Sequence, residues 1–350
     1  MKSLNEIKWT PVRLINIFDR VSRGKRLKKA NHIPGNIPYV SSTATENGTD
    51  GSCGNSIGVR IFEDCITIAN SGSVGACFYH PYRFIASDHV TALKKLGICA
   101  DCYLSLSVLI SRLGEKYNFN REINDTRLSR EQIMLPILDD GSPDYDYLAK
   151  YTQHKRKKML NKYRKYVESK ILLLGDIVDI PELNKKEWNK FIIDDIFYIS
   201  PGKRLESHNR TSGDRPFIGA LDNNNGIADF VSDRNSSLDS NVLGVNYNGS
   251  GMCLGFYHSY ECIFSDDVKR FHLKNYPDGK YVLLFLKIAI QQQKSKFGYL
   301  YKFNAERMAR QKIMLPINNE GSPDYKYMEQ YSKNMMLKKY KKYLKYMNEK

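Results

Sequence analysis

The sequence of 350 residues has no run of about 18 uninterrupted apolar residues, the length that spans a bilayer, so membrane-spanning helices are not expected. Residues 1–8 include no apolar core of the kind that a secretory signal has, which predicts a cytoplasmic chain. The seven cysteines are an odd number and too few for a disulfide framework in a chain of this length. We therefore expect reduced thiols and neither secretion nor membrane insertion.

Several catalytic motifs are also missing. There is no Gly-x-x-x-x-Gly-Lys-Ser/Thr phosphate loop, and no Pro-Pro dipeptide from which an adenine methyltransferase motif is built. Pro143-Asp144 with Glu168-Ser169-Lys170 fits the loose pattern of a metal nuclease, but Pro323-Asp324 is followed by no Glu-x-Lys. Cys99-Ala100-Asp101-Cys102 is a lone Cys-x-x-Cys pair, so no metal site is expected.

Positive charge is in excess and is concentrated in two segments. The chain has 54 Lys and Arg against 38 Asp and Glu, a formal net charge of +16. Residues 150–170 include nine basic and one acidic residue, and residues 333–350 include seven and one, so these segments hold fourteen of the sixteen net charges. Such segments suit a polyanion such as DNA or RNA, an acidic protein partner, or a solvated helix face, and these alternatives stay open.

The chain repeats itself, at an offset of 178 or 179 residues that grows to 180 near the end of each copy. So many collinear matches indicate a tandem duplication. The matches include Trp9 with Trp188, Gly24-Lys25-Arg26-Leu27 with Gly202-Lys203-Arg204-Leu205, Phe78-Tyr79-His80 with Phe256-Tyr257-His258, Ile133-Met134-Leu135-Pro136 with Ile313-Met314-Leu315-Pro316, and Gly141-Ser142-Pro143-Asp144-Tyr145 with Gly321-Ser322-Pro323-Asp324-Tyr325.

Each copy has the same order of expected elements. Short β-like runs come first, an apolar helical patch follows at 103–112 or 281–291, and the Ile-Met-Leu-Pro strand closes the copy. The Gly-Ser-Pro-Asp turn then starts a long helix, with Ser142 or Ser322 as the expected N-cap. The sequence therefore predicts an α+β fold of two tandem domains, each followed by a long helix. The expected limits are 1–141 for the first domain, 142–174 for its helix, 175–321 for the second domain and 322–350 for its helix.

Both long helices have a narrow apolar stripe. A stripe this narrow is typical of a coiled coil, so the two helices are expected to pair with each other. The alternative, that each helix packs only on its own domain, stays open. The stripe residues are Leu160, Tyr163 and Val167 in the first helix and Met336, Tyr340, Tyr343 and Met347 in the second.

Three motifs of the first copy are the opening Gly35-Asn36-Ile37-Pro38-Tyr39, the turn Gly72-Ser73-Val74-Gly75 and the closing Ser129-Arg130-Glu131-Gln132-Ile133. Paired domains with motifs of this kind resemble the specificity (S) subunit of type I restriction–modification systems. The Asp-Asp-Gly-Ser-Pro-Asp-Tyr turn is closer to the S chains of type IIB enzymes. The resemblance covers nearly the whole chain, and the second copy departs from it at 213–216 and 248–251.

The resemblance implies that each copy is a target recognition domain that reads one half of a bipartite site in double-stranded DNA. It also implies that the two helices pair as an antiparallel coiled coil and dock methyltransferase (M) subunits, with two expected. The chain would be non-catalytic and without a cofactor or metal of its own, since S-adenosylmethionine would bind the methyltransferase. A restriction (R) subunit is left open. The rival hypotheses are a stand-alone duplicated RNA-binding or structural protein and a metal-dependent nuclease.

Loop-like sequence holds the candidate DNA contacts. The duplicated basic pairs suit phosphates or guanines, while the Gly-rich turns offer amides and hydroxyls to a phosphate or are plain hairpins. Arg127, Arg130, Arg307 and Arg310 recur before the closing strand and are either contacts or structural residues. The DNA-binding candidates are Lys25, Arg26, Ser71, Ser73, Lys203, Arg204, Asn248 and Ser250.

Overall fold

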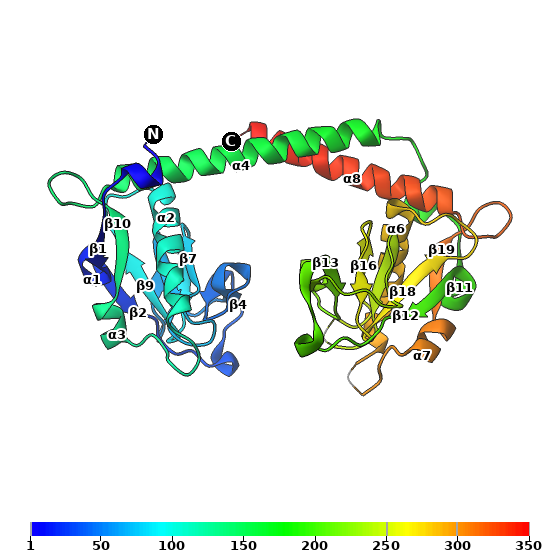
Figure 1. Ribbon diagram of the computed structural model, residues 1–350, viewed down its shortest axis with the longest axis horizontal. Helices are drawn as coiled ribbons and strands as arrows, with labels where there is room; N and C mark the ends of the chain where they lie inside the picture. The colour runs from blue at the N-terminus through cyan, green and yellow to red at the C-terminus, as the bar shows by residue number, and fades with distance from the viewer. Residues whose placement is uncertain (1, 250, 299, 350) are drawn as a thin grey trace. The chain divides into compact units, whose positions relative to one another are not determined.

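The computed structural model describes residues 2–249, 251–298 and 300–349. The chain divides into two compact units, Met1–Tyr163 (unit 1) and Arg164–Lys350 (unit 2), and the boundary falls inside helix α4 (Tyr145–Leu174). Each unit mixes strands and helices and ends in a long helix, so the predicted α+β fold of two tandem domains is confirmed (Figure 1). None of the helices among the described residues has both the length and the apolar character needed to cross a membrane.

Unit 1 contains two four-stranded sheets and one two-stranded pair. Its strands are β1 (Trp9–Arg13), β2 (Arg20–Arg23), β3 (Ile37–Val40), β4 (Thr49–Cys53), β5 (Ile61–Phe62), β6 (Cys65–Ala69), β7 (Cys77–His80), β8 (Phe84–Ala86), β9 (Val90–Lys94) and β10 (Gln132–Pro136). Its helices are α1 (Leu14–Ile17), α2 (Ala100–Ser111), α3 (Asp125–Arg130) and the first part of α4. The sheets have the orders β2-β9-β6-β7 and β4-β3-β8-β5, and β1 pairs with β10.

Unit 2 has the same plan. Its strands are β11 (Trp188–Ile192), β12 (Phe197–Pro201), β13 (Ser212–Ile218), β14 (Ile227–Val231), β15 (Val242–Asn246), β16 (Gly255–His258), β17 (Ile263–Phe264), β18 (Val268–Leu273) and β19 (Lys312–Pro316). Its helices are α5 (Ile193–Ile196), α6 (Lys280–Gln291), α7 (Ala305–Arg310) and α8 (Tyr325–Asn348). The sheets have the orders β12-β18-β15-β16 and β14-β13-β17, and β11 pairs with β19.

The duplication extends to the strand register. In unit 1 the first strand pairs with the last, with Trp9 opposite Pro136, and in unit 2 Trp188 is opposite Pro316. Because a one-residue slip would turn every side chain to the other face of the sheet, equal registers place matching residues on matching faces. The two units can therefore be compared position by position.

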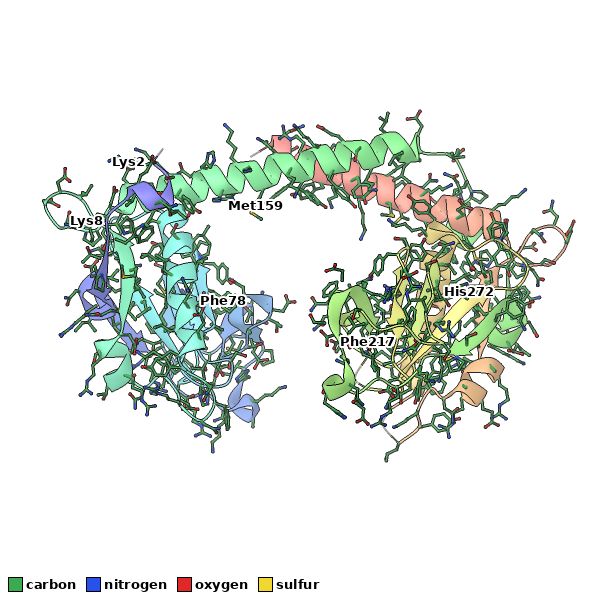
Figure 2. All side chains as sticks on the ribbon, viewed as in Figure 1. Lys2, Lys8, Phe78, Met159, Phe217 and His272 are labelled. Carbon is green, nitrogen blue, oxygen red and sulfur yellow. The ribbon has the colours of Figure 1, made fainter. Side chains whose placement is uncertain are left out.

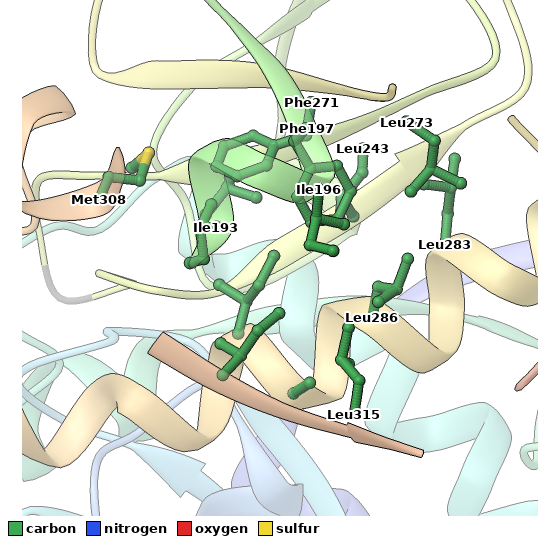
Figure 3. Close-up of a cluster of buried hydrophobic side chains, with 14 of the residues drawn as sticks. Ile193, Ile196, Phe197, Leu243, Phe271, Leu273, Leu283, Leu286, Met308 and Leu315 are labelled. Carbon is green, nitrogen blue, oxygen red and sulfur yellow. The ribbon is translucent and has the colours of Figure 1, made fainter. Parts of the chain in front are cut away.

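The apolar helical patches predicted from the sequence form α2 and α6, and each packs against its own sheet. In unit 2 the core joins α5, α6 and the strands, with Phe197 and Phe271 in edge-to-face contact at 5.1 Å between ring centroids (Figure 3). Burial of a side chain of this size contributes about 1.5–3 kcal/mol. Leu286 of α6 and Leu315 of β19 are fully buried in the same core, so the closing strand is part of it.

The prediction that serines cap the long helices is wrong. Asp324 is the N-cap of α8, where its Oδ1 accepts the Tyr327 N–H at 3.0 Å, and Asp144 accepts the Tyr147 N–H at 2.8 Å in α4. The hydroxyl of Ser142 instead donates to Asp140 within the preceding turn. An aspartate also suits this place because the helix N-terminus has a partial positive charge.

The apolar stripe of the two long helices is buried to different degrees. Val167 is fully buried, while Leu160 and Tyr163 are 38% and 42% exposed. In α8 the stripe residues Met336, Tyr340, Tyr343 and Met347 are half-buried. The first turns of α8 pack on α6 through Met328, so this part of the helix belongs to its own unit. The antiparallel pairing of the two helices stays a prediction.

Candidate nucleic-acid interface

The first duplicated basic pair lies on a loop whose backbone is held tightly. The Lys25 N–H donates to the Ala86 carbonyl at 3.0 Å. A Cβ atom on Gly24 would lie 2.0 Å from the Ser87 carbonyl oxygen, so only glycine fits at this position. The backbone is thereby fixed, while the side chains of Lys25 and Arg26 remain exposed.

Unit 2 repeats this geometry with different charge. A Cβ atom on Gly202 would lie 2.0 Å from the Ser265 carbonyl oxygen. Lys203 and Arg204 are exposed, and Arg204 pairs with Glu206 at 2.9 Å. The second basic pair is therefore partly neutralised by a neighbouring carboxylate.

The segments around the two basic pairs also differ in net charge, and unit 1 again has the more positive one. Residues 20–29 of unit 1 include six basic residues and no acidic residue, whereas residues 198–207 of unit 2 include two basic residues and one acidic residue. Since exposed cations attract phosphate at a distance, unit 1 presents the stronger positive potential at this loop.

The Gly-Ser turn of unit 1 lies beside the same loop. The Ser71 hydroxyl is hydrogen-bonded to Nδ1 of His89, and Ser71 is 6% exposed, whereas Ser73 is half-buried. The structure thus brings Lys25 and Ser71 to one segment of the chain, residues 86–90.

Four backbone amides of this turn, those of residues 73–76, are already occupied. These four amides therefore cannot contribute to a phosphate cradle, and both alternatives for the turn stay predictions. The amide of Ser73 donates to Ser42, Val74 to Gly72, Gly75 to Ala69, and Ala76 to Ser73.

In unit 2 the turn is attached in the same way. Nδ2 of Asn248 donates to Oδ1 of Asp267 at 3.0 Å, and the Tyr247 N–H donates to the Asp267 carbonyl. Ser250 lies outside the described residues. A DNA contact by any of the eight candidates stays a prediction.

The recurring arginines before the closing strand have local partners. Arg127 donates to the Glu122 carbonyl at 2.6 Å and Arg307 to the Lys302 carbonyl at 2.9 Å, which favours the structural alternative for this pair. The remaining two differ, since Arg130 is exposed and Arg310 pairs with Glu306 at 3.0 Å. Sequence reasoning missed Asn124 and Asn304, which are the N-caps of α3 and α7. An Asn before a helix is a usable signal for such a cap.

The duplicated histidines are buried. Burial lowers the pKa of His80 and of His258 to about 4, so both rings are neutral at pH 7. Nε2 of His80 is hydrogen-bonded to the Thr67 hydroxyl at 2.8 Å. Gly244 takes the place of this threonine in unit 2, and in the described part of the chain Nε2 of His258 has no hydrogen-bond partner. Both rings are thus part of the packed interior of their units.

Unit 1 has a groove of about 560 Å³ that the sequence reasoning missed. We call it the cationic groove. It is lined by Arg20, Phe62, Glu63, Arg83, Ala92 and Lys94 together with Ser22, Ile61 and Cys65. Most of these residues come from separate strands, while Glu63 and Arg83 lie between strands, so the strand register brings them together.

The cysteines offer no metal site. Among the residues that the structure describes, no three His, Cys, Asp or Glu side chains are grouped as metal ligands would be. All seven cysteines are free, and only Cys99 is exposed. Burial raises the pKa of Cys102 to about 12, so the second thiol of the Cys-x-x-Cys pair stays protonated at neutral pH.

The chain has a duplicated α+β architecture, and it matches a known family. A family model described as the type I restriction modification DNA specificity domain matches twice, over residues 6–162 and 185–345. The chain belongs to this family, and the prediction of a specificity subunit of a restriction–modification system is confirmed.

The proteins that this chain is similar to come from a type II system and from type I systems. The chain is 39% identical over 338 residues to the Type II restriction enzyme BgcI specificity subunit S.BcgI of Heyndrickxia coagulans, which covers 95% of each chain. The solved S subunit of a type I system from M. genitalium aligns with a TM-score of 0.51 at 16% identity, over 99% of this chain and 95% of that chain, and shares the fold. The HsdS subunit from Thermoanaerobacter tengcongensis aligns at 13% identity with a TM-score of 0.33, over 95% and 91% of the two chains.

Proposed function

We propose that this specificity subunit selects a bipartite site in double-stranded DNA, with each unit reading one half. The observation that carries the proposal is one backbone built twice with different side chains on its surface. Gly24 and Gly202 fix equal loops, whereas the charge around those loops differs between the units. Equal backbones with unequal contact residues are what two different half-sites require.

The chain in this proposal supplies recognition and no catalytic group. Methyl transfer belongs to methyltransferase partners, which bind S-adenosylmethionine and act where both units find their sequences. Two such partners follow from the two copies, and a restriction subunit is a further partner of the same assembly. The exposed basic faces of α4 and α8 are the proposed platform for these subunits.

The test is a map of modified bases in genomic DNA from cells with the gene intact and with the gene deleted. We expect deletion to abolish methyladenine at one split motif. Complementation with Lys25→Ala/Arg26→Ala or with Lys203→Ala/Arg204→Ala is the matched pair, since each should weaken modification through one half-site only. An unchanged map in cells where the chain copurifies with a methyltransferase would contradict the proposal.

The role of the helices has a separate test. We expect a chain truncated at Asp324, which lacks α8, to lose copurification with the methyltransferase. Circular dichroism and thermal unfolding check that both units of the truncated chain are still folded, because Met328 of α8 is part of the core of unit 2. Undiminished copurification of the truncated chain would show that α8 is not needed to bind the methyltransferase.

A further inference from the structure

The cationic groove of unit 1 has more positive than negative charge. Arg20, Arg83 and Lys94 line it together with one carboxylate, Glu63. Arg20 and Lys94 are paired in register on β2 and β9, which places both side chains on the same face of the sheet. Within the described ranges none of the three cations has a salt-bridge partner, and Nζ of Lys94 donates to the Glu63 carbonyl at 3.1 Å. The groove is therefore short of negative charge.

Small side chains keep the groove open. Ala92 and Ser22 are opposite each other in the register, and the buried Cys65 adds a further small side chain. Phe62 and Ile61 form an apolar wall. A volume of about 560 Å³ with a few polar groups and an apolar wall is in the range of small-ligand sites and is larger than one carboxylate side chain needs.

Unit 2 has closed the same place with its own side chains. By register, Arg270 takes the position of Ala92 and His272 the position of Lys94, while Asp239 stands at the position of Phe62. Arg270 pairs with Asp239 at 2.8 Å, and the two histidine nitrogens lie 3.1 Å from Asp239 and 2.7 Å from Asp278. His272 is labelled in Figure 2 and lies on β18, the strand that pairs with β12. In unit 2, therefore, ion pairs between its own side chains neutralise the cations at this place, whereas the cations of the groove stay without such partners in the described part of unit 1.

We propose that the cationic groove binds a phosphate group, which its repeat in unit 2 cannot do. Three cations against one carboxylate leave two positive charges, which match one phosphate monoester or two neighbouring phosphodiesters of a DNA backbone, and arginine forks bind phosphate oxygens in pairs. The apolar wall accommodates the sugar or base attached to that phosphate. The inference rests on the proposed function where the phosphate belongs to the DNA backbone, and a free nucleotide is the other source of the same chemistry.

The test measures binding of the full chain to duplex DNA of random sequence over a range of salt concentrations. The slope of log K against log salt becomes shallower by about 0.9 for each phosphate that the protein no longer neutralises. For Arg20→Gln/Arg83→Gln we expect the slope to decrease by about 2. Lys8→Gln/Arg13→Gln removes the same charge from exposed sites of unit 1 and should change the slope by less than about 0.5.

A second variant fills the groove instead of discharging it. Phe62→Asp/Ala92→Arg/Lys94→His installs the closing residues of unit 2, and we expect the same decrease in slope. Calorimetry with adenosine monophosphate and with inorganic phosphate is the parallel measurement, with thermal unfolding as the check on folding.

The outcomes separate the sources of the phosphate. A reduced slope in both groove variants identifies DNA phosphates as the ligand. An unchanged slope, with adenosine monophosphate or inorganic phosphate bound by the native chain but not by either variant, identifies a free phosphate. The inference is overturned if both variants keep the slope and the native chain binds neither small molecule. Absence of any duplex binding by the native chain would instead remove the proposed function, and the calorimetric arm would still decide on the groove.

Discussion

Units 1 and 2 share the residues that shape the backbone and differ in residues that line their surfaces. Gly24 and Gly202 are identical because the carbonyl 2.0 Å from a would-be Cβ tolerates nothing larger. Ala92 and Arg270 stand at one register position, yet one leaves a groove open and the other closes it. After duplication, therefore, the backbone contacts were retained while the surface chemistry diverged.

The buried histidines extend the comparison to the interior. His80 has the Thr67 hydroxyl as a partner, but His258 faces Gly244, where a Cβ atom would lie 2.9 Å from the Phe264 ring. Unit 2 therefore tolerates an unpaired ring nitrogen where unit 1 has a hydrogen bond.

The largest effect is expected from substitution of the shared glycines. Gly24→Ala or Gly202→Ala forces a Cβ atom into a backbone carbonyl and should lower the free energy of unfolding of its own unit by about 3 kcal/mol or more. Denaturant unfolding measures this. Gly298→Ala is the control, because a Cβ there meets nothing within 4 Å. Equal stability of the glycine variants and the control would refute the close approach.

Acid is expected to destabilise both units through their histidines. A pKa lowered from 6.5 to about 4 in the folded state means that the unfolded chain binds the proton first, so stability is full above pH 6.5 and is lost as the pH falls toward 4. Each histidine contributes up to about 3 kcal/mol to this loss. Unfolding curves between these pH values measure it, and His80→Phe or His258→Phe should remove the corresponding part.

High pH is expected to destabilise unit 2 through a histidine that unit 1 lacks. Hydrogen bonds to Asp278 and Asp239 raise the pKa of His272 to about 9, so its contribution is present below pH 6.5 and is lost as the pH rises through 9. Unit 1 has no histidine at this position, where Lys94 stands. The measurement is unfolding of native and His272→Gln chains over this range, and parallel curves would contradict the prediction. The effect should be smaller than that of acid, because the His272 side chain is 29% exposed.

Thr67→Val should make the interior of unit 1 resemble that of unit 2. The substitution keeps the shape of the side chain but leaves Nε2 of His80 unpaired, which lowers the free energy of unfolding by about 1–3 kcal/mol. Chemical denaturation gives the value, with Ser56→Ala, at an exposed position, as the control. A neutral result would mean that the hydrogen bond does not stabilise unit 1.

The smallest difference is expected at the starts of the long helices. Asp144→Ala and Asp324→Ala each remove an N-cap, at a cost of about 1 kcal/mol. Asp324 also pairs with Lys186 at 2.9 Å, where unit 1 has Ile7, so its loss should cost more. A double-mutant cycle with Lys186→Met measures the coupling energy between Asp324 and Lys186. A coupling energy of zero would show that this ion pair does not stabilise unit 2.

Much of the fold could be predicted from the sequence because the signals are local or repeated. The apolar periods that became α2 and α6, the Ile-Met-Leu-Pro strand that became β10 and β19, and the duplication itself are all visible in the chain. The choice between Ser142 and Asp144 as a cap could not be made, since both residue types cap helices and only the turn geometry separates them.

The candidate site was predictable only in part. Lys25 and Ser71 could be proposed from composition, but their meeting on the segment 86–90 depends on strand pairing between residues far apart in the sequence. The same is true of the cationic groove, where Arg20 and Lys94 become neighbours through the register of β2 and β9. The pairing of strands that are far apart in the sequence cannot be predicted from a local residue pattern.

The distribution of thiols makes this chain unusually convenient for spectroscopy. Six of the seven cysteines are buried, and Cys99, next to the first turn of α2, is the one that a maleimide reagent can reach in the folded chain. A fluorophore or spin label can therefore be attached to unit 1 without substituting any residue. A second label on an engineered cysteine in unit 2 would then report the distance between the units in solution, with and without DNA.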